Sequence, residues 1–138
     1  MSTERTMGKA VFIANDVSNL STDATQSNLD NLSFIFETSC GFTRINADSG
    51  GLHKNVSSEN WESLKSVIHK QTFDDTGYLV FAISSHGGIL LRDDKAEELC
   101  IELYDKKPLS VKDIIDVMQG VGHEDMIKIL IVCACRGM

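Results

Sequence analysis

A histidine and a cysteine, which together can carry nucleophilic catalysis, stand at the ends of two apolar runs. His86 follows the run 78–84, Cys135 ends the run 129–135, and a glycine comes shortly after each. A cysteine attacks as its thiolate, so it needs an imidazole or imidazolium beside it near pH 7. Alone, the histidine would more often be structural and the cysteine a small buried hydrophobe. Together they predict a thiol nucleophile with a histidine partner.

The apolar runs alternate with segments of helical periodicity along the chain. Such alternation is typical of an α/β fold with a mostly parallel sheet, and nearly continuous apolar strands indicate a sheet covered on both faces. We predict strands at 9–14, 42–45, 78–83 and 128–132, within one domain over 1–138. In such folds the chemistry lies beyond the carboxyl ends of the strands, where both His86 and Cys135 fall.

Three helices are predicted between these strands. The residues expected to cap or end them are Ser21, Thr22, Asp23, Gly41, Ser57, Ser58, Ser110 with Asp113, Gly120 and Gly122. The residues expected to face the core are Leu29, Leu32, Phe36, Trp61, Leu64, Ile68, Val111, Ile114, Ile115 and Met118. A small excursion, with arms at 89–91 and 99–104 and a polar tip at 92–95, is expected before Pro108 closes it.

The motifs around the pair resemble those of the caspase family of cysteine peptidases. The segment 85–87 matches the family's Ser-His-Gly, and 134–137 matches the Ala-Cys-Arg-Gly core of its nucleophile motif. Cys135 lies 49 positions after His86, near the family's spacing. The likeness also covers the opening strand (9–16), the first helix and its exit (31–42) and the strand before the nucleophile (128–132), which is nearly the whole chain.

This resemblance implies a large subunit with a caspase-like three-layer sandwich, completed by a small subunit and paired with a second large/small pair. It implies that Cys135 attacks the scissile carbonyl, that His86 is the general acid and base, and that the backbone N–H groups of Gly87 and Cys135 form the oxyanion hole. No metal or organic cofactor is expected. The resemblance further implies protein substrates, a zymogen precursor, and a role in apoptosis or related signalling. The short N-terminus leaves no room for a recruitment prodomain, unless one was removed.

The sequence departs from the family where the substrate aspartate is held. Caspases use an arginine from the loop before the first helix, but 10–43 contains no lysine or arginine, and Thr22 falls near that position. The family's glutamine two residues before the nucleophile is Cys133 here, and Gln26 and Asn28 replace aspartates of the first helix. Thr22, Ser85 and Cys133 are the expected pocket residues. A thiol or hydroxyl does not replace a bidentate guanidinium contact, unless Arg44 or Arg92 reaches the pocket.

Two hypotheses therefore stay open. In the first, the protein is an active peptidase with a weak or altered preference for aspartate before the cut. In the second, it is a catalytically impaired homologue that pairs with an active caspase as a decoy or regulator. The retained His86 and Cys135 favour the first hypothesis, whereas the altered pocket favours the second.

Composition and charge exclude other classes of function. The net charge of −7 argues against nucleic-acid binding, which needs a basic face. The longest apolar runs are far shorter than the roughly 20 residues of a membrane-spanning helix, and the N-terminus lacks the layout of a signal peptide. A cytoplasmic location is therefore expected, and in that reducing compartment the four cysteines should be free thiols. They form no Cys-x-x-Cys pair, so no structural zinc is expected.

Overall fold

The structure, a computed structural model, describes residues 8–15, 27, 30–45, 53–54, 56–73, 76–91 and 97–136. Its strands are β1 (Gly8–Ala14), β2 (Thr43–Arg44), β3 (His53–Lys54), β4 (Tyr78–Leu91), β5 (Glu97–Glu102), β6 (Pro108–Ser110) and β7 (Ile127–Arg136). They form one sheet in the order β2-β1-β4-β5-β6, with β3 also beside β1 and β7 beside β4. The ladders that join β1 to β2, β3 and β4, and β4 to β7, are parallel; the two that involve β5 are antiparallel.

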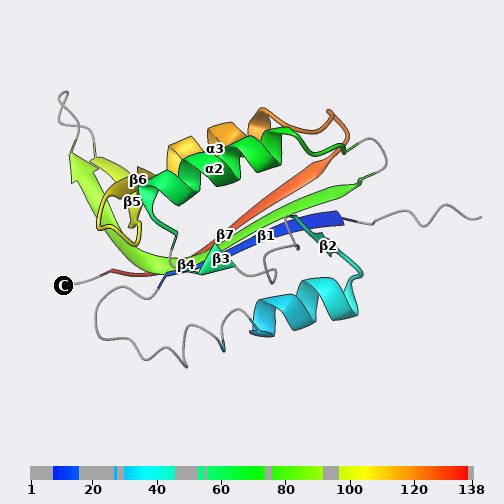
Figure 1. The fold of residues 1–138 in the computed structure, drawn as a ribbon, viewed down its shortest axis with the longest axis horizontal. Helices are drawn as coiled ribbons and strands as arrows, with labels where there is room; N and C mark the ends of the chain where they lie inside the picture. The colour runs from blue at the N-terminus through cyan, green and yellow to red at the C-terminus, as the bar shows by residue number, and fades with distance from the viewer. Residues whose placement is uncertain are drawn as a thin grey trace, which may run out of the picture.

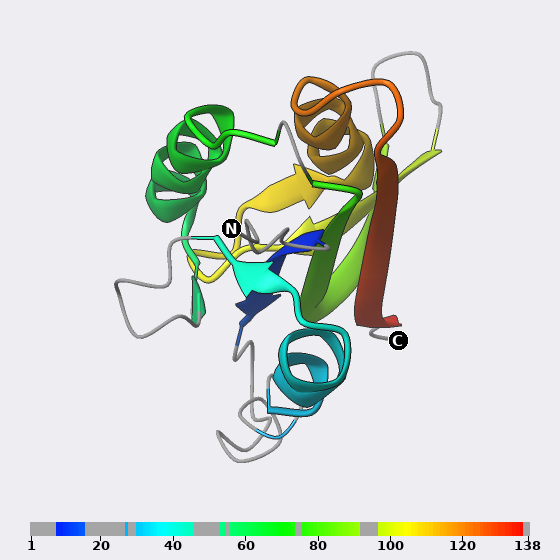
Figure 2. The ribbon, with the colours of Figure 1, turned by 90° about the vertical axis from the view of Figure 1, so that its right-hand side faces the viewer.

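Helices cover both faces of this sheet, which makes the fold a three-layer α/β sandwich (Figures 1 and 2). On one face lie α2 (Ser58–His69) and α3 (Val111–Gln119). On the other lies the first helix, whose last part is the π-helical segment η1 (Phe34–Ser39). The predicted mostly parallel sheet between helical layers is therefore confirmed.

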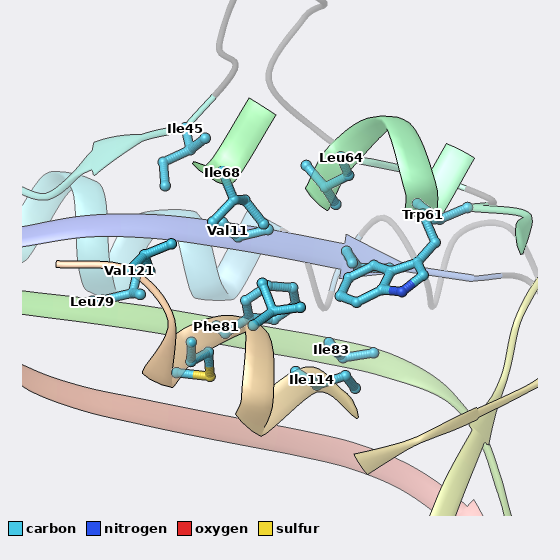
Figure 3. Packing of buried hydrophobic residues seen from close by; sticks show 14 of the residues in the cluster. Val11, Ile45, Trp61, Leu64, Ile68, Leu79, Phe81, Ile83, Ile114 and Val121 are labelled. Carbon is cyan, nitrogen blue, oxygen red and sulfur yellow. The ribbon is translucent and has the colours of Figure 1, made fainter. Parts of the chain in front are cut away.

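The core under α2 and α3 is built from alternate strand residues (Figure 3). Its principal members are Val11 and Ile13 of β1, Leu79, Phe81 and Ile83 of β4, Trp61, Leu64 and Ile68 of α2, and Ile114, Val117 and Met118 of α3. Trp61 packs edge-on against Phe81, with ring centroids 5.9 Å apart. Each such apolar side chain contributes about 1.5–3 kcal/mol when fully buried. This layer therefore fixes which face of each strand points toward α2 and α3.

The intervening strand residues form a second core on the opposite face. Ala10, Phe12 and Ala14 of β1 join Val80 and Ala82 of β4 there, and Leu32, Phe36, Phe42, Ile129 and Ile131 pack against them. Three aromatic rings follow one another along this layer, with centroid distances of 6.2 Å from Phe12 to Phe36 and 5.6 Å from Phe36 to Phe42. The expected inward positions of Leu32 and Phe36 are confirmed.

The helix ends follow the local signals of the sequence. Ser57 caps α2, and Asn60 completes a reciprocal capping box with it. The Ser110 hydroxyl caps α3 by accepting from the Lys112 N–H. Gly41 takes a left-handed φ of 73° just after η1, and its N–H bonds the Glu37 carbonyl. Glycine adopts that conformation without a side-chain clash, so the helix ends there.

Three expectations need correction. Ile115 is 38% exposed rather than inward, because the inward stripe of α3 is Ile114, Val117 and Met118. Pro108 begins β6 rather than only closing the excursion, as proline can at the first residue of a strand. Strands β4 and β7 also do not end before His86 and Cys135 but continue through them.

Several expectations lie outside the described residues. They are the caps Ser21, Thr22 and Asp23, the substitutions Gln26 and Asn28, the core residue Leu29, and the polar tip 92–95. Among the residues that are described, no helix has the length and apolar character needed to cross a bilayer.

Candidate active site

His86 and Cys135 are direct register partners in neighbouring parallel strands. The ladder between β4 and β7 runs from the pair Tyr78 and Ile127 to the pair Gly87 and Arg136, and His86 lies opposite Cys135 within it. Adjacent strands are about 4.8 Å apart. The backbone thus brings these two residues, 49 positions apart in sequence, to neighbouring points one residue before the end of the β4–β7 ladder, although β4 itself runs on to Leu91.

Packing far from the pair sets this register. In the same ladder Ala82 faces Ile131 and Ile83 faces Val132, so that one pair contributes to each core layer. A slip of one residue would move every β7 side chain to the opposite face of the sheet. Residues 129–132 are apolar without a break and supply side chains to both core layers, and in the register that they adopt Cys135 lies opposite His86.

Gly87 lies at a junction of two ladders. Its register partner in β7 is Arg136 and its partner in β5 is Ile101. A cavity of about 100 Å³ opens here, with Gly87, Gly88 and Cys100 in its lining. Small residues at this point allow space to remain beside the strand that carries His86.

The Cys100 thiol in this cavity is a poor candidate for a nucleophile. Burial raises its pKa, and the neighbouring carboxylates of Glu98 and Glu102 raise it further. A raised pKa keeps the sulfur protonated near neutral pH, whereas the attacking species is the thiolate. The three cysteines whose side chains are described, Cys40, Cys100 and Cys133, are free, as expected.

The expected pocket residues fall in different environments. Cys133 is exposed on β7, opposite Ser84 and two residues before Cys135. Ser85 is only 7% exposed, and its hydroxyl donates to the Glu102 carbonyl oxygen at 2.5 Å. Thr22 lies outside the described residues. Of the three, Cys133 is the one whose side chain the structure places at an accessible surface near the pair.

Arg44 is engaged elsewhere. Its guanidinium forms an ion pair with Glu37, donates to Ser33 Oγ at 3.0 Å and lies over the Phe12 ring, 5.5 Å from the centroid. Arg44 pairs with Ala10 on β1, and Ala10 pairs with Val80, six residues before His86. At about 3.3 Å per residue, Arg44 is about 20 Å from His86 along the strands. Arg92 lies outside the described residues.

A larger groove, of about 570 Å³, shares Pro108 with the cavity beside Gly87. Residues of α2, α3 and the start of β6 line it, among them Trp61, Lys65, Pro108 and Asp113. Of the predicted residues whose side chains the structure describes, neither Ser85 nor Cys133 belongs to its lining. Among the described side chains, no group of three or more His, Cys, Asp and Glu is placed to hold a metal ion.

One residue near the pair was not singled out from the sequence. Asn15 follows the last residue of β1 and is only 2% exposed, and its side-chain nitrogen lies close to Ser85 within β4 and to the carbonyl of Glu102 at the end of β5. The available signal was a polar residue directly after the buried run 9–14. A buried amide requires hydrogen-bond partners, so its position follows from the segments that meet around it.

With this geometry in place, comparison with solved structures identifies the fold as that of the caspases. The chain matches the crystal structure of the Drosophila initiator caspase Dronc with a TM-score of 0.64 and 15% sequence identity. The match covers 93% of this chain and 49% of that chain, so the chain spans about half the length of that caspase. A scan against protein-family models and a search of curated proteins each found no match.

Proposed function

We propose that the chain is the large subunit of a caspase-type cysteine endopeptidase that acts in the cytoplasm, in apoptosis or related signalling. The observation that carries the proposal is the register that places His86 opposite Cys135 on β4 and β7. Exposed free thiols at Cys40 and Cys133 fit a reducing compartment.

In this mechanism the Cys135 thiolate attacks the scissile carbonyl carbon and expels the amine as an acyl-enzyme forms. His86 gives the leaving amine its proton and then activates the water that releases the acyl group. The backbone register alone places the two positions opposite each other in neighbouring strands, as a nucleophile and its acid–base partner require. The N–H groups of Gly87 and Cys135 would stabilise the oxyanion of the tetrahedral intermediate.

Turnover of a peptide library by the full-length protein tests this proposal, with Cys135→Ala as its matched control. Varying the residue before the cut also measures specificity. We expect cleavage by the wild type and none by the control. If neither protein cleaves and the wild type instead binds an active caspase tightly, the protein is a decoy or regulator and the peptidase proposal fails.

We further propose that its preference for aspartate before the cut is weak. The Arg44 guanidinium is held by Glu37 and Ser33 about 20 Å along the strands from His86. Cys133 occupies the position two residues before the nucleophile, and its side chain has no amide group to bind the substrate carboxylate. A lost hydrogen bond to a charged group costs about 1.5–3 kcal/mol, which is roughly ten- to a hundredfold in rate.

Cys133→Gln tests this second proposal. The substitution supplies an amide donor at an exposed position of β7, so we expect kcat/KM for aspartate to rise relative to other residues, with the overall rate maintained. Cys133→Ser is the matched control, since it changes the side chain without adding an amide. Fast cleavage strictly after aspartate by the wild type would show that another residue binds the carboxylate.

The β7 strand supports a proposal about partners. Within the described residues β7 pairs with β4 alone. Its residues 129–132 are only partly buried, although their register partners 80–83 on β4 are at most 1% exposed. An exposed apolar edge, such as 129–132 presents between Lys128 and Arg136, is a template for a further strand. We therefore propose that a strand of a small subunit pairs with β7 and that two such large/small pairs associate.

Amide hydrogen exchange measures this pairing. Alternate N–H groups of a strand point to its two sides, so those of β7 that do not face β4 exchange fast in the isolated chain. In the complete protein we expect these amides to be protected like the others. Fast exchange of alternate amides in 127–136 of the complete protein would contradict the proposed strand.

A further inference from the structure

Strand β4 changes its partner on one side next to His86. The parallel ladder with β1 ends at the pair of Ala14 and Ser84, and the antiparallel ladder with β5 begins at the pair of Ile101 and Gly87. Ser85 and His86 are the two β4 residues between these ladders. On the other side, β4 stays paired with β7 through both of them. The backbone at His86 is therefore held regularly on one side only.

A buried polar cluster occupies this gap. Continuing the β1 register by one residue puts Asn15 beside Ser85, and continuing the β5 register puts Glu102 beside His86. The Asn15 N–H donates to the Ser84 carbonyl at 2.9 Å, and the Ser85 hydroxyl donates to the Glu102 carbonyl at 2.5 Å. Side-chain and backbone groups thus replace the ladder bonds between the point on β4 where its pairing with β1 stops and the point where its pairing with β5 begins.

The Asn15 amide joins this cluster to a fourth segment. Its Oδ1 accepts from the Val56 N–H at 2.7 Å, in the segment before α2. Its Nδ2 lies 3.5 Å from both Ser85 Oγ and the Glu102 carbonyl oxygen. One side chain that is 2% exposed therefore supplies an acceptor and a donor group to three segments. Buried backbone groups need such partners, so this amide fixes how the segments meet.

We propose that Asn15, acting through Ser85, is a positioning residue that holds the backbone of His86 at its place opposite Cys135. This inference rests on the proposed peptidase function. Ser85 is covalently bonded to His86, and its hydroxyl is tied to the β5 carbonyl beside which the Asn15 amide lies. Loss of the amide frees the β4 junction to shift, while the ladder between β4 and β7 still maintains the fold.

The test is the pH dependence of Cys135 alkylation by iodoacetamide in the full-length protein, together with kcat and KM for its best peptide. Asn15→Ala should move the alkylation midpoint toward the ordinary thiol value of about 8.5. It should lower kcat by roughly ten- to a hundredfold, as small misplacements of catalytic groups do, with KM changing less than kcat. Asn60→Ala is the matched control, because its amide caps α2 through Ser57 in the adjacent segment. Both readouts should stay at wild-type values in that variant.

Three further variants keep the outcomes distinct. Ser85→Ala should change both readouts in the same direction as Asn15→Ala, and Ser85→Ala carries the test if Asn15→Ala does not fold. The Asn15→Ala/Ser85→Ala double variant should lose less activity than the sum of the two single losses. If His86→Ala leaves the alkylation profile unchanged, the proposed function has failed, and this inference with it. If the profile depends on His86 but stays at wild type in Asn15→Ala or, failing that, Ser85→Ala, only the positioning inference is overturned.

Discussion

A disulfide introduced between β4 and β7 would test the register on which the site depends. Ser84 lies opposite Cys133, two positions before the pair of His86 and Cys135. Neighbouring strands are about 4.8 Å apart, which falls within the roughly 4.4–6.8 Å between Cα atoms that a disulfide requires. We expect Ser84→Cys to form a bond with Cys133 on mild oxidation. Adding Cys135→Ser to this variant removes the neighbouring thiol that could exchange with the new disulfide.

The expected gain in stability follows from the loop that this bond closes. Residues 84–133 make a loop of about 50 residues, for which the chain-entropy relation gives about 4 kcal/mol at 25 °C. Engineered bonds often give less because of strain, so this value is a ceiling. The free energy of unfolding, measured in denaturant with and without reductant, should therefore rise on oxidation by no more than this amount.

The assay is the intact mass and the peptide map after oxidation, with Ser85→Cys as the matched control. Ser85 pairs with Ala134, and alternation puts it on the opposite face of the sheet from Cys133. The control should therefore remain reduced. If Ser84→Cys stays reduced while Ser85→Cys crosslinks to Cys133, the register is wrong by one residue and His86 does not lie opposite Cys135.

Three further predictions concern stability and thiol chemistry. Phe81→Ala should lower the free energy of unfolding by about 3–5 kcal/mol, measured in denaturant, because the ring is buried against Trp61. The pKa of Asp105 is lowered chiefly by the hydrogen bond from the Ser58 side chain, so the stability it adds is present above the ordinary carboxyl pKa and is lost as pH falls through the lowered value. Asp105→Asn should therefore have a lower Tm than wild type at pH 7, and the difference in Tm should vanish in acid. A difference in Tm that does not change with pH would contradict this. Because its pKa is raised, Cys100 should react with iodoacetamide more slowly near pH 8 than the exposed cysteines, as peptide mapping would show; equal rates would contradict its burial.

Local features of the fold could be predicted from the sequence because each depends on neighbouring residues. The cap at Ser57 and the inward face of Trp61, Leu64 and Ile68 follow from helical spacing over a few turns, and the structure confirms them. Ile115 was misplaced because an apolar residue one position from the inward stripe looks the same in a pattern.

Features that depend on distant segments could not be read from pattern alone. That β7 lies beside β4 depends on packing among segments about 50 residues apart, which no local pattern of the sequence records. The continuation of β4 past His86 depends on β5, which offers backbone partners from Gly87 onward. The role of Asn15 depends on four segments that meet only in the folded chain.

A double-mutant cycle on peptide cleavage by the complete protein tests the central claim most directly. The values to compare are kcat/KM for the wild type, His86→Ala, Cys135→Ala and the double variant, with one substrate. If the two residues act as one unit, each single change removes most of the activity and the double variant loses no more than the worse single variant. Wild-type rates in Cys135→Ala, or losses in the two single variants that add in the double variant, would contradict the account.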